Sequence, residues 1–125
     1  MDMVLALMVK PGEHPSPALI CGDRDYLRQI VSVGTVLTFT TALLDLEDGI
    51  AALFNMDGPL LGLPGNRRIG DRIITGDFYI VRYDSRGKLI SLRAEDVVKC
   101  TNKFWHIEEF SEEEILDAHF ERLGL

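Results

Sequence analysis

The order of apolar and polar positions predicts a chain in which short strands are interspersed with amphipathic helices. Runs of apolar, β-branched and aromatic residues bounded by glycine, proline or acidic turns are typical of strands. Apolar residues at helical spacing, with charged residues on the opposite face, are typical of helices. Strands are predicted at residues 3–9, 18–21, 36–44, 50–55, 77–83 and 89–92, and helices at residues 23–32, 93–104 and 111–123.

Turn signals indicate how the strands are joined. Acidic residues precede Gly49, and Gly87 follows Asp84-Ser85-Arg86, so that hairpins are expected at residues 45–49 and 84–88. Hairpins pair neighbouring strands in opposite directions. We therefore expect an α+β fold, a mostly antiparallel sheet of about five or six strands with three helices in a single compact domain.

The chain length and its last segment refine this organisation. A chain of 125 residues has the usual size of one domain. Residues 1–107 are expected to form the core domain, and residues 108–125 an acidic C-terminal helix packed on it. That helix begins with a capping-box pattern, in which Ser111 caps the helix and Glu114 reaches back.

The segment 55–68 combines several glycines and prolines with two adjacent arginines. Glycine permits positive φ and proline fixes φ, so residues 62–66 are predicted to form an ordered turn rather than a flexible linker. Residues 69–76 are predicted to be a short irregular or single-turn segment. Ordered loops on rigid scaffolds often carry binding sites.

Charge is distributed unevenly around a net charge of −7. Residues 1–64 carry three bases and eight acids, residues 65–103 nine bases and five acids, and residues 107–125 one base and seven acids. An acidic protein is a poor nonspecific binder of nucleic acid, so no direct nucleic-acid contact is predicted. The acidic C-terminal segment suits a basic surface on a partner protein, and its candidate partner-binding residues are Glu108, Glu109, Glu112, Glu113 and Glu114.

The cationic middle part offers a candidate ligand site at Asn66, Arg67, Arg68 and Arg72. Arginine donates paired hydrogen bonds to phosphates and carboxylates, and asparagine can bind an amide or a base edge. A structural alternative remains open. In it, Asn66 ties the backbone of the turn and Arg67 pairs with an acid such as Asp57 or Asp71.

Catalytic and metal sites have weaker support in the sequence. Cys21 and Cys100 lie in apolar surroundings without a CxxC motif, which favours buried thiols in a reducing compartment. The acidic turn at residues 45–49 lacks the spacing of a calcium loop. We therefore predict no catalytic residue, no metal and no cofactor. A small hydrolase would need His106, Cys21 or Cys100.

The N-terminal apolar run is predicted to be a strand rather than a targeting segment. It is short, lacks a basic region before it, and is followed by Lys10-Pro11-Gly12 instead of a cleavage site. No apolar run approaches the roughly 20 residues that a membrane-spanning helix needs, so no membrane contact is predicted.

The middle of the chain resembles the family called domain of unknown function 3846. The resemblance covers roughly residues 3–110 and rests on Asn55-x-x-Gly58-x-x-x-Gly62-Leu63-Pro64-x-Asn66-Arg67, on Ile74-x-Gly76-x-Phe78-x-Ile80, and on Ser91-Leu92 before a helix that ends in Phe104. Members are short proteins or modules from phages, plasmids and gut bacteria. The resemblance implies an α+β domain and a mobile-element context, since similar modules occur in large phage or plasmid proteins thought to counter host defences.

Three functional hypotheses follow from the resemblance and the charge pattern. The first is a noncatalytic protein in the bacterial cytoplasm that inhibits a host defence system by docking on a host protein, such as a nucleic-acid-binding defence factor. The second is sequestration of a small anionic nucleotide at the Gly-Leu-Pro-Gly-Asn-Arg turn. The third is a small hydrolase. A homodimer is expected if the last helix leaves apolar residues exposed.

Overall fold

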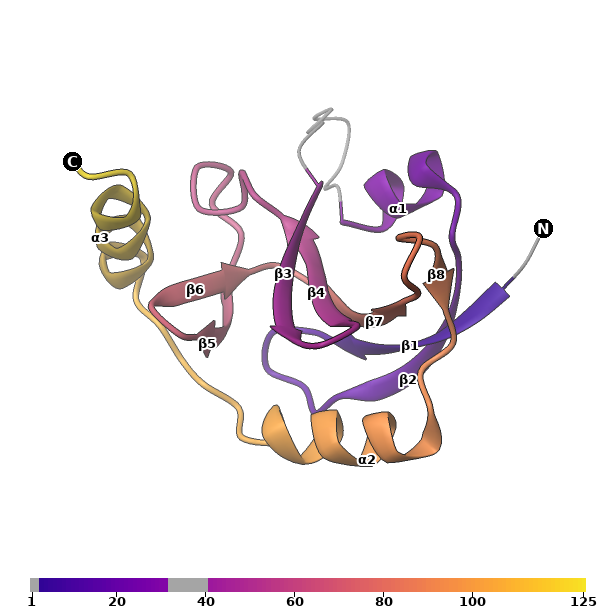
Figure 1. The fold of residues 1–125 in the computed structure, drawn as a ribbon. Helices are drawn as coiled ribbons and strands as arrows, with labels where there is room; N and C mark the ends of the chain where they lie inside the picture. Colours follow the sequence, from indigo (N-terminus) through magenta and orange to yellow (C-terminus); the bar gives the residue numbers. More distant parts are fainter. Residues whose placement is uncertain (1–2, 32–40) are drawn as a thin grey trace.

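The computed structural model describes residues 3–31 and 41–125 (Figure 1). The predicted strand at residues 36–44 thus lies partly outside the described residues. The helices are α1 (Arg24–Val31), α2 (Ala94–Lys103) and α3 (Glu112–Arg122). The strands are β1 (Met3–Val9), β2 (Ser16–Cys21), β3 (Thr41–Glu47), β4 (Ile50–Asn55), β5 (Gly65–Ile69), β6 (Arg72–Thr75), β7 (Phe78–Tyr83) and β8 (Leu89–Ile90).

The described strands form two antiparallel sheets. The larger has six strands in the order β2-β1-β7-β4-β3, with β8 also paired to β7, and the smaller is the β5–β6 hairpin. At the centre of the larger sheet, Ile80 of β7 pairs with Leu7 of β1 on one side and with Ala52 of β4 on the other. The α+β fold and the mostly antiparallel sheet predicted from the sequence are confirmed.

Alternating side chains of the central strands build a core on each face of the sheet. On β7, Phe78 and Ile80 face the core that includes Cys100 and Phe104 near the end of α2. Tyr79 and Val81 face the opposite core, against α1. The continuous apolar runs in the sequence exist because these strands are covered on both faces. Figure 1 shows α2 and α1 on either side of the sheet.

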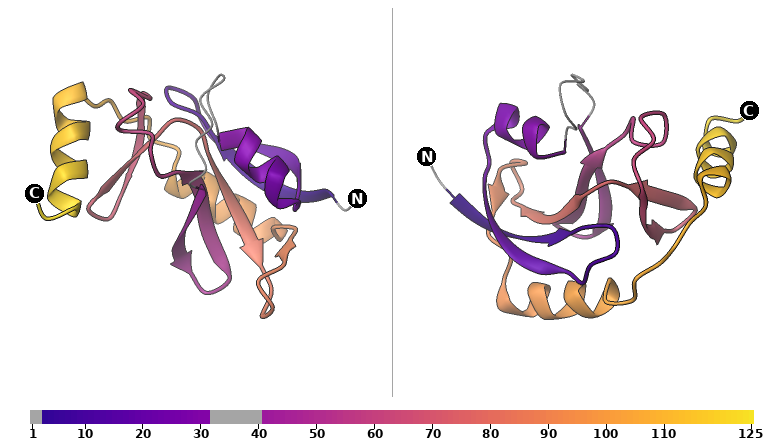
Figure 2. Two further views of the ribbon diagram at one scale, coloured as in Figure 1. Left: turned by 90° about the horizontal axis from the view of Figure 1, so that it is seen from above. Right: turned by 180° about the vertical axis from the view of Figure 1, so that it is seen from behind.

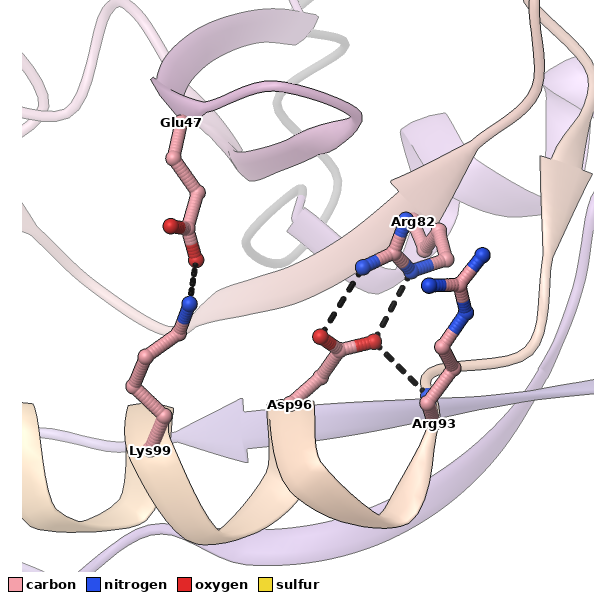
Figure 3. A network of polar contacts seen from close by, with 5 residues as sticks. All are labelled: Glu47, Arg82, Arg93, Asp96 and Lys99. Atoms are coloured by element: carbon pink, nitrogen blue, oxygen red, sulfur yellow. Dashed lines mark hydrogen bonds and ion pairs between the residues drawn. The ribbon is translucent and has the colours of Figure 1, made fainter.

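A partly buried ion pair holds α2 against the sheet (Figure 3). Arg82 on β7 donates to both carboxylate oxygens of Asp96, from Nε at 2.8 Å and from Nη2 at 2.9 Å. The same carboxylate accepts the backbone N–H of Arg93 at 2.8 Å and so caps the helix. An ion pair between Lys99 and Glu47 lies nearby. The helix is therefore positioned by charge at its first turn and by apolar packing further along.

The α3 helix packs on the β5–β6 hairpin, on the opposite side of the molecule from α1 (Figure 2). Its predicted capping box is confirmed: Ser111 Oγ accepts the Glu114 N–H at 3.1 Å, and Glu114 Oε1 accepts the Ser111 N–H at 3.0 Å. Hydrogen bonds from Ser111 hold the pKa of Glu114 below its ordinary value.

The prediction of an irregular segment at residues 69–76 is wrong, because Arg72–Thr75 forms β6 and pairs with β5. The predicted turn at residues 62–66 also ends earlier, since Gly65 and Asn66 belong to β5. Polar residues at buried positions hide the alternation by which a strand is recognised. The acidic turn is shorter than predicted, because Asp45 and Glu47 lie on β3.

Replacing Asp96 with asparagine is expected to lower the free energy of unfolding at pH 7 by about 1–3 kcal/mol, because Arg82 loses the charge of its hydrogen-bond partner. The hydrogen bonds from Arg82 hold the pKa of Asp96 below its ordinary value. The Asp96 carboxylate therefore stabilises the fold fully above its unfolded pKa of about 3.9, and this stabilisation is lost as the pH falls through the lower pKa of the folded state. Urea denaturation at pH 7 and at about pH 3 would measure this. An equal deficit at both pH values, or an equal effect of Glu95→Gln, would contradict the prediction.

Replacing Gly65 with alanine is expected to loosen α3. A Cβ at this position would lie 2.7 Å from Phe110 Cδ2 and 3.2 Å from Ile115 Cδ1. We expect the free energy of unfolding to fall by about 1–3 kcal/mol. Gly22→Ala is the control, since its Cβ would meet only Leu89 Cβ at 3.7 Å. Similar stabilities of the two variants would argue against close packing at Gly65.

Candidate functional site

Asn66 and Arg67 lie inside the protein, with 0% and 1% of their surface exposed. The Asn66 side-chain nitrogen donates to the main-chain oxygens of Val9 and Gly76, each at 2.8 Å. Gly76 has a φ of 72°, which glycine adopts readily. These bonds connect β5 to the end of β1 and to the turn between β6 and β7.

The Arg67 guanidinium is held by oxygens from three segments. Nε donates to the Phe104 carbonyl at 3.0 Å, and Nη2 donates to the Glu13 carbonyl at 2.7 Å. Nη1 donates to the carbonyl of Asn66 at 3.2 Å and to its side-chain oxygen at 2.8 Å. Phe104 ends α2, where the helix dipole places partial negative charge. Burial lowers the pKa of Arg67, and the Glu108 carboxylate partly opposes that effect.

These contacts favour a structural role for Asn66 and Arg67, but the partners of Arg67 differ from those expected. The sequence suggested an ion pair of Arg67 with Asp57 or Asp71, whereas the described partners of its guanidinium are uncharged oxygens. A ligand-binding role for Asn66 and Arg67 stays a prediction. It would require a ligand to displace hydrogen bonds that hold the fold.

Arg68 lies on the exposed face of the same strand. Its backbone N–H donates to Glu108 Oε2 at 3.0 Å, and its guanidinium carbon lies 5.7 Å from the ring centroid of Phe110. Both contacts hold the segment that leads into α3. The side chain remains accessible to a ligand or partner.

Arg72 on β6 lines a cavity of about 320 Å³ between the hairpin and α3. Its guanidinium carbon lies 5.0 Å from the ring centroid of Phe54. The cavity also contains Thr75, His119 and Arg122, which sequence reasoning missed as site residues. No local signal identifies them, because they are brought together only when α3 packs on β6.

The five predicted partner-binding glutamates divide into two groups. Glu108 and Glu114 accept backbone N–H groups and fix the segment before and at the start of α3. Glu109, Glu112 and Glu113 are exposed. An open groove of about 760 Å³ is lined by Glu108, Glu109 and Glu112. The apolar part of the groove is formed by Pro11, Leu63, Pro64, Ile107, Phe110, Ile115 and Leu116.

The cysteines and histidines considered for catalysis lie in different settings. Cys21 and Cys100 are free and buried, and burial raises the pKa of the Cys100 thiol. His106 is exposed, while His14 stacks on Trp105 with ring centroids 3.8 Å apart and donates from Nδ1 to the Trp105 carbonyl at 2.8 Å. Within the described part of the chain, no three His, Cys, Asp or Glu residues are grouped so that they could hold a metal ion.

The fold and the buried Asn–Arg pair define an α+β domain in which a hairpin is locked to a central sheet. The chain belongs to the family described as Domain of unknown function (DUF3846), whose model matches residues 3–105, and the resemblance read from the sequence is confirmed. The match includes every described strand and ends before α3. No curated protein and no solved structure matches the chain. None of the described helices is long and apolar enough to cross a membrane.

Replacing Arg67 with lysine is expected to lower the free energy of unfolding by about 2–4 kcal/mol, because an ammonium group cannot reach all of these oxygens. The control is Arg68→Lys on the exposed face of β5, for which a change within about 0.5 kcal/mol is expected. Chemical denaturation of both variants measures the difference. A fully stable Arg67→Lys protein would show that the buried guanidinium is not needed for folding.

Proposed function

We propose that the protein is a noncatalytic binding protein of a phage or mobile element that inhibits a host defence system by docking on a host protein. The acidic groove beside α3 is the contact surface in this proposal. The mobile-element context comes from the family resemblance, and the choice of surface comes from the geometry of the groove. The host cell cytoplasm is the expected site of action.

The observation that carries the proposal is an apolar groove with carboxylates on its rim. Glu109 and Glu112 are exposed at its edge, while Phe110 and Leu116 contribute half-buried apolar surface. Protein interfaces commonly combine an apolar centre with a polar rim. Because the rim is acidic, the fitting partner presents an apolar anchor surrounded by lysine or arginine, as nucleic-acid-binding surfaces often do.

The rigidity of this segment also supports docking. The Glu108 and Glu114 carboxylates are used to fix the chain, so the exposed glutamates are presented from an ordered backbone. A preorganised surface loses less entropy when it binds. The exposed apolar residues Phe120 of α3 and Leu123, which follows the helix, would serve a homodimer in the same hypothesis.

The other two hypotheses receive less support from the geometry. A nucleotide at the Gly-Leu-Pro-Gly-Asn-Arg turn would have to compete with the fold for Asn66 and Arg67. A thiol hydrolase would need a reactive thiolate, and burial disfavours ionisation of Cys100.

The proposal is tested by affinity capture from bacterial lysate with the Glu109→Gln/Glu112→Gln variant. We expect the wild-type protein to retain a host protein at about 0.05 M salt and to release it at about 0.5 M, since salt screens charge pairs. The variant should retain much less. The matched control is Asp48→Asn/Glu95→Gln, which also removes two exposed charges, one of them in the first turn of a helix. Equal capture by both variants would contradict docking through the groove.

A further inference from the structure

The cavity between α3 and the β5–β6 hairpin is separate in chemistry from the acidic groove. It has a volume of about 320 Å³, near the lower end of the range for small-molecule sites. Phe54, Pro59, Leu60 and Leu123 give it apolar walls. Its polar groups come from β6, from the C-terminal half of α3, and from Asn55 and Asp57 at and just after the end of β4. The cavity therefore combines apolar surface with a small number of polar groups.

Two arginines line this cavity. Arg72 comes from β6 and Arg122 from the last turn of α3. Burial lowers the pKa of Arg72 and the positive charge of Arg122 lowers it further, while Asp71 partly opposes both effects. Within the described residues, neither arginine forms an ion pair. Like charges held close together are unfavourable, and an anion between them would remove the repulsion.

Two buried polar atoms on the cavity residues have no hydrogen-bond partner among the described residues. They are Thr75 Oγ1 and His119 Nε2. Thr75 is 1% exposed, and a buried hydroxyl without a partner costs about 1–3 kcal/mol. A Cβ at Gly58 would lie 2.0 Å from Thr75 Oγ1, so only glycine leaves room for the hydroxyl there. Buried polar groups without partners often indicate a missing ligand or ion.

We propose that this cavity binds a small organic phosphate of about the size of a nucleoside monophosphate. The phosphate lies between Arg72 and Arg122, and Thr75 Oγ1 and His119 Nε2 donate hydrogen bonds to it. Donors from two elements suit the several terminal oxygens of a phosphate better than the two of a carboxylate. The remainder of the ligand contacts the apolar walls. This site does not depend on the docking function proposed above, whose acidic rim is formed by residues that do not line the cavity.

Isothermal titration of the full chain with AMP, phenyl phosphate and adenosine tests the proposal. We expect saturable one-to-one binding of at least one of the two phosphates and none of adenosine, because adenosine lacks the charge that the arginines require. Arg72→Gln and Arg122→Gln should each weaken binding by about tenfold or more. Arg86→Gln, in the exposed turn before β8, should leave the affinity unchanged.

Thr75→Val separates a binding role from a structural one. Valine keeps the shape of threonine but removes the unpaired hydroxyl, so we expect an unchanged or higher melting temperature together with weaker phosphate binding. The proposal is overturned if neither phosphate binds, if adenosine binds as well as AMP, or if Arg72→Gln and Arg86→Gln have equal affinity. If Thr75→Val lowers the melting temperature but leaves the phosphate affinity unchanged, the Thr75 hydroxyl does not bind the phosphate.

Discussion

Burial of the Arg67 guanidinium is the constraint on which the arrangement of the other elements depends. A cation inside a protein must be surrounded by oxygen atoms, because isolated buried charge is strongly unfavourable. Here the oxygens come from the turn after β1, from the end of α2 and from neighbouring Asn66. Asn66 extends the same network to Val9 and Gly76. The hairpin, the central sheet and α2 are thus held in one relative position.

This constraint changes how the cationic middle of the sequence is understood. Arg67 is used inside the fold, and Arg82 is paired with Asp96 at the start of α2. Of the predicted ligand-binding arginines, Arg68 supports the approach to α3 and Arg72 reaches a cavity. Part of the positive charge of the middle region is therefore used within the fold. Arg67 and Arg82 make structural contacts, and Arg72 lines a cavity between β6 and α3.

Much of the fold was predictable because strands buried on both faces and amphipathic helices leave strong periodic patterns. The capping box at Ser111 and the turn glycine at Gly87, with a φ of 81°, were also readable from local chemistry. The β5–β6 hairpin could not be predicted from the sequence, since Asn66 and Arg67 occupy buried positions where apolar residues are expected. The cavity was beyond sequence reasoning for a different reason. His119 belongs to α3, and only tertiary packing brings it close to β6.

The central claim is that Arg67 is a buried anchor of the fold, and proton exchange at its Nε–H group tests this most directly. In the structure, this group donates to the Phe104 carbonyl at 3.0 Å and is shielded from solvent. NMR should therefore detect a slowly exchanging Nε–H signal for Arg67 and rapid exchange for exposed Arg68. Equally rapid exchange at both guanidinium groups would contradict the account.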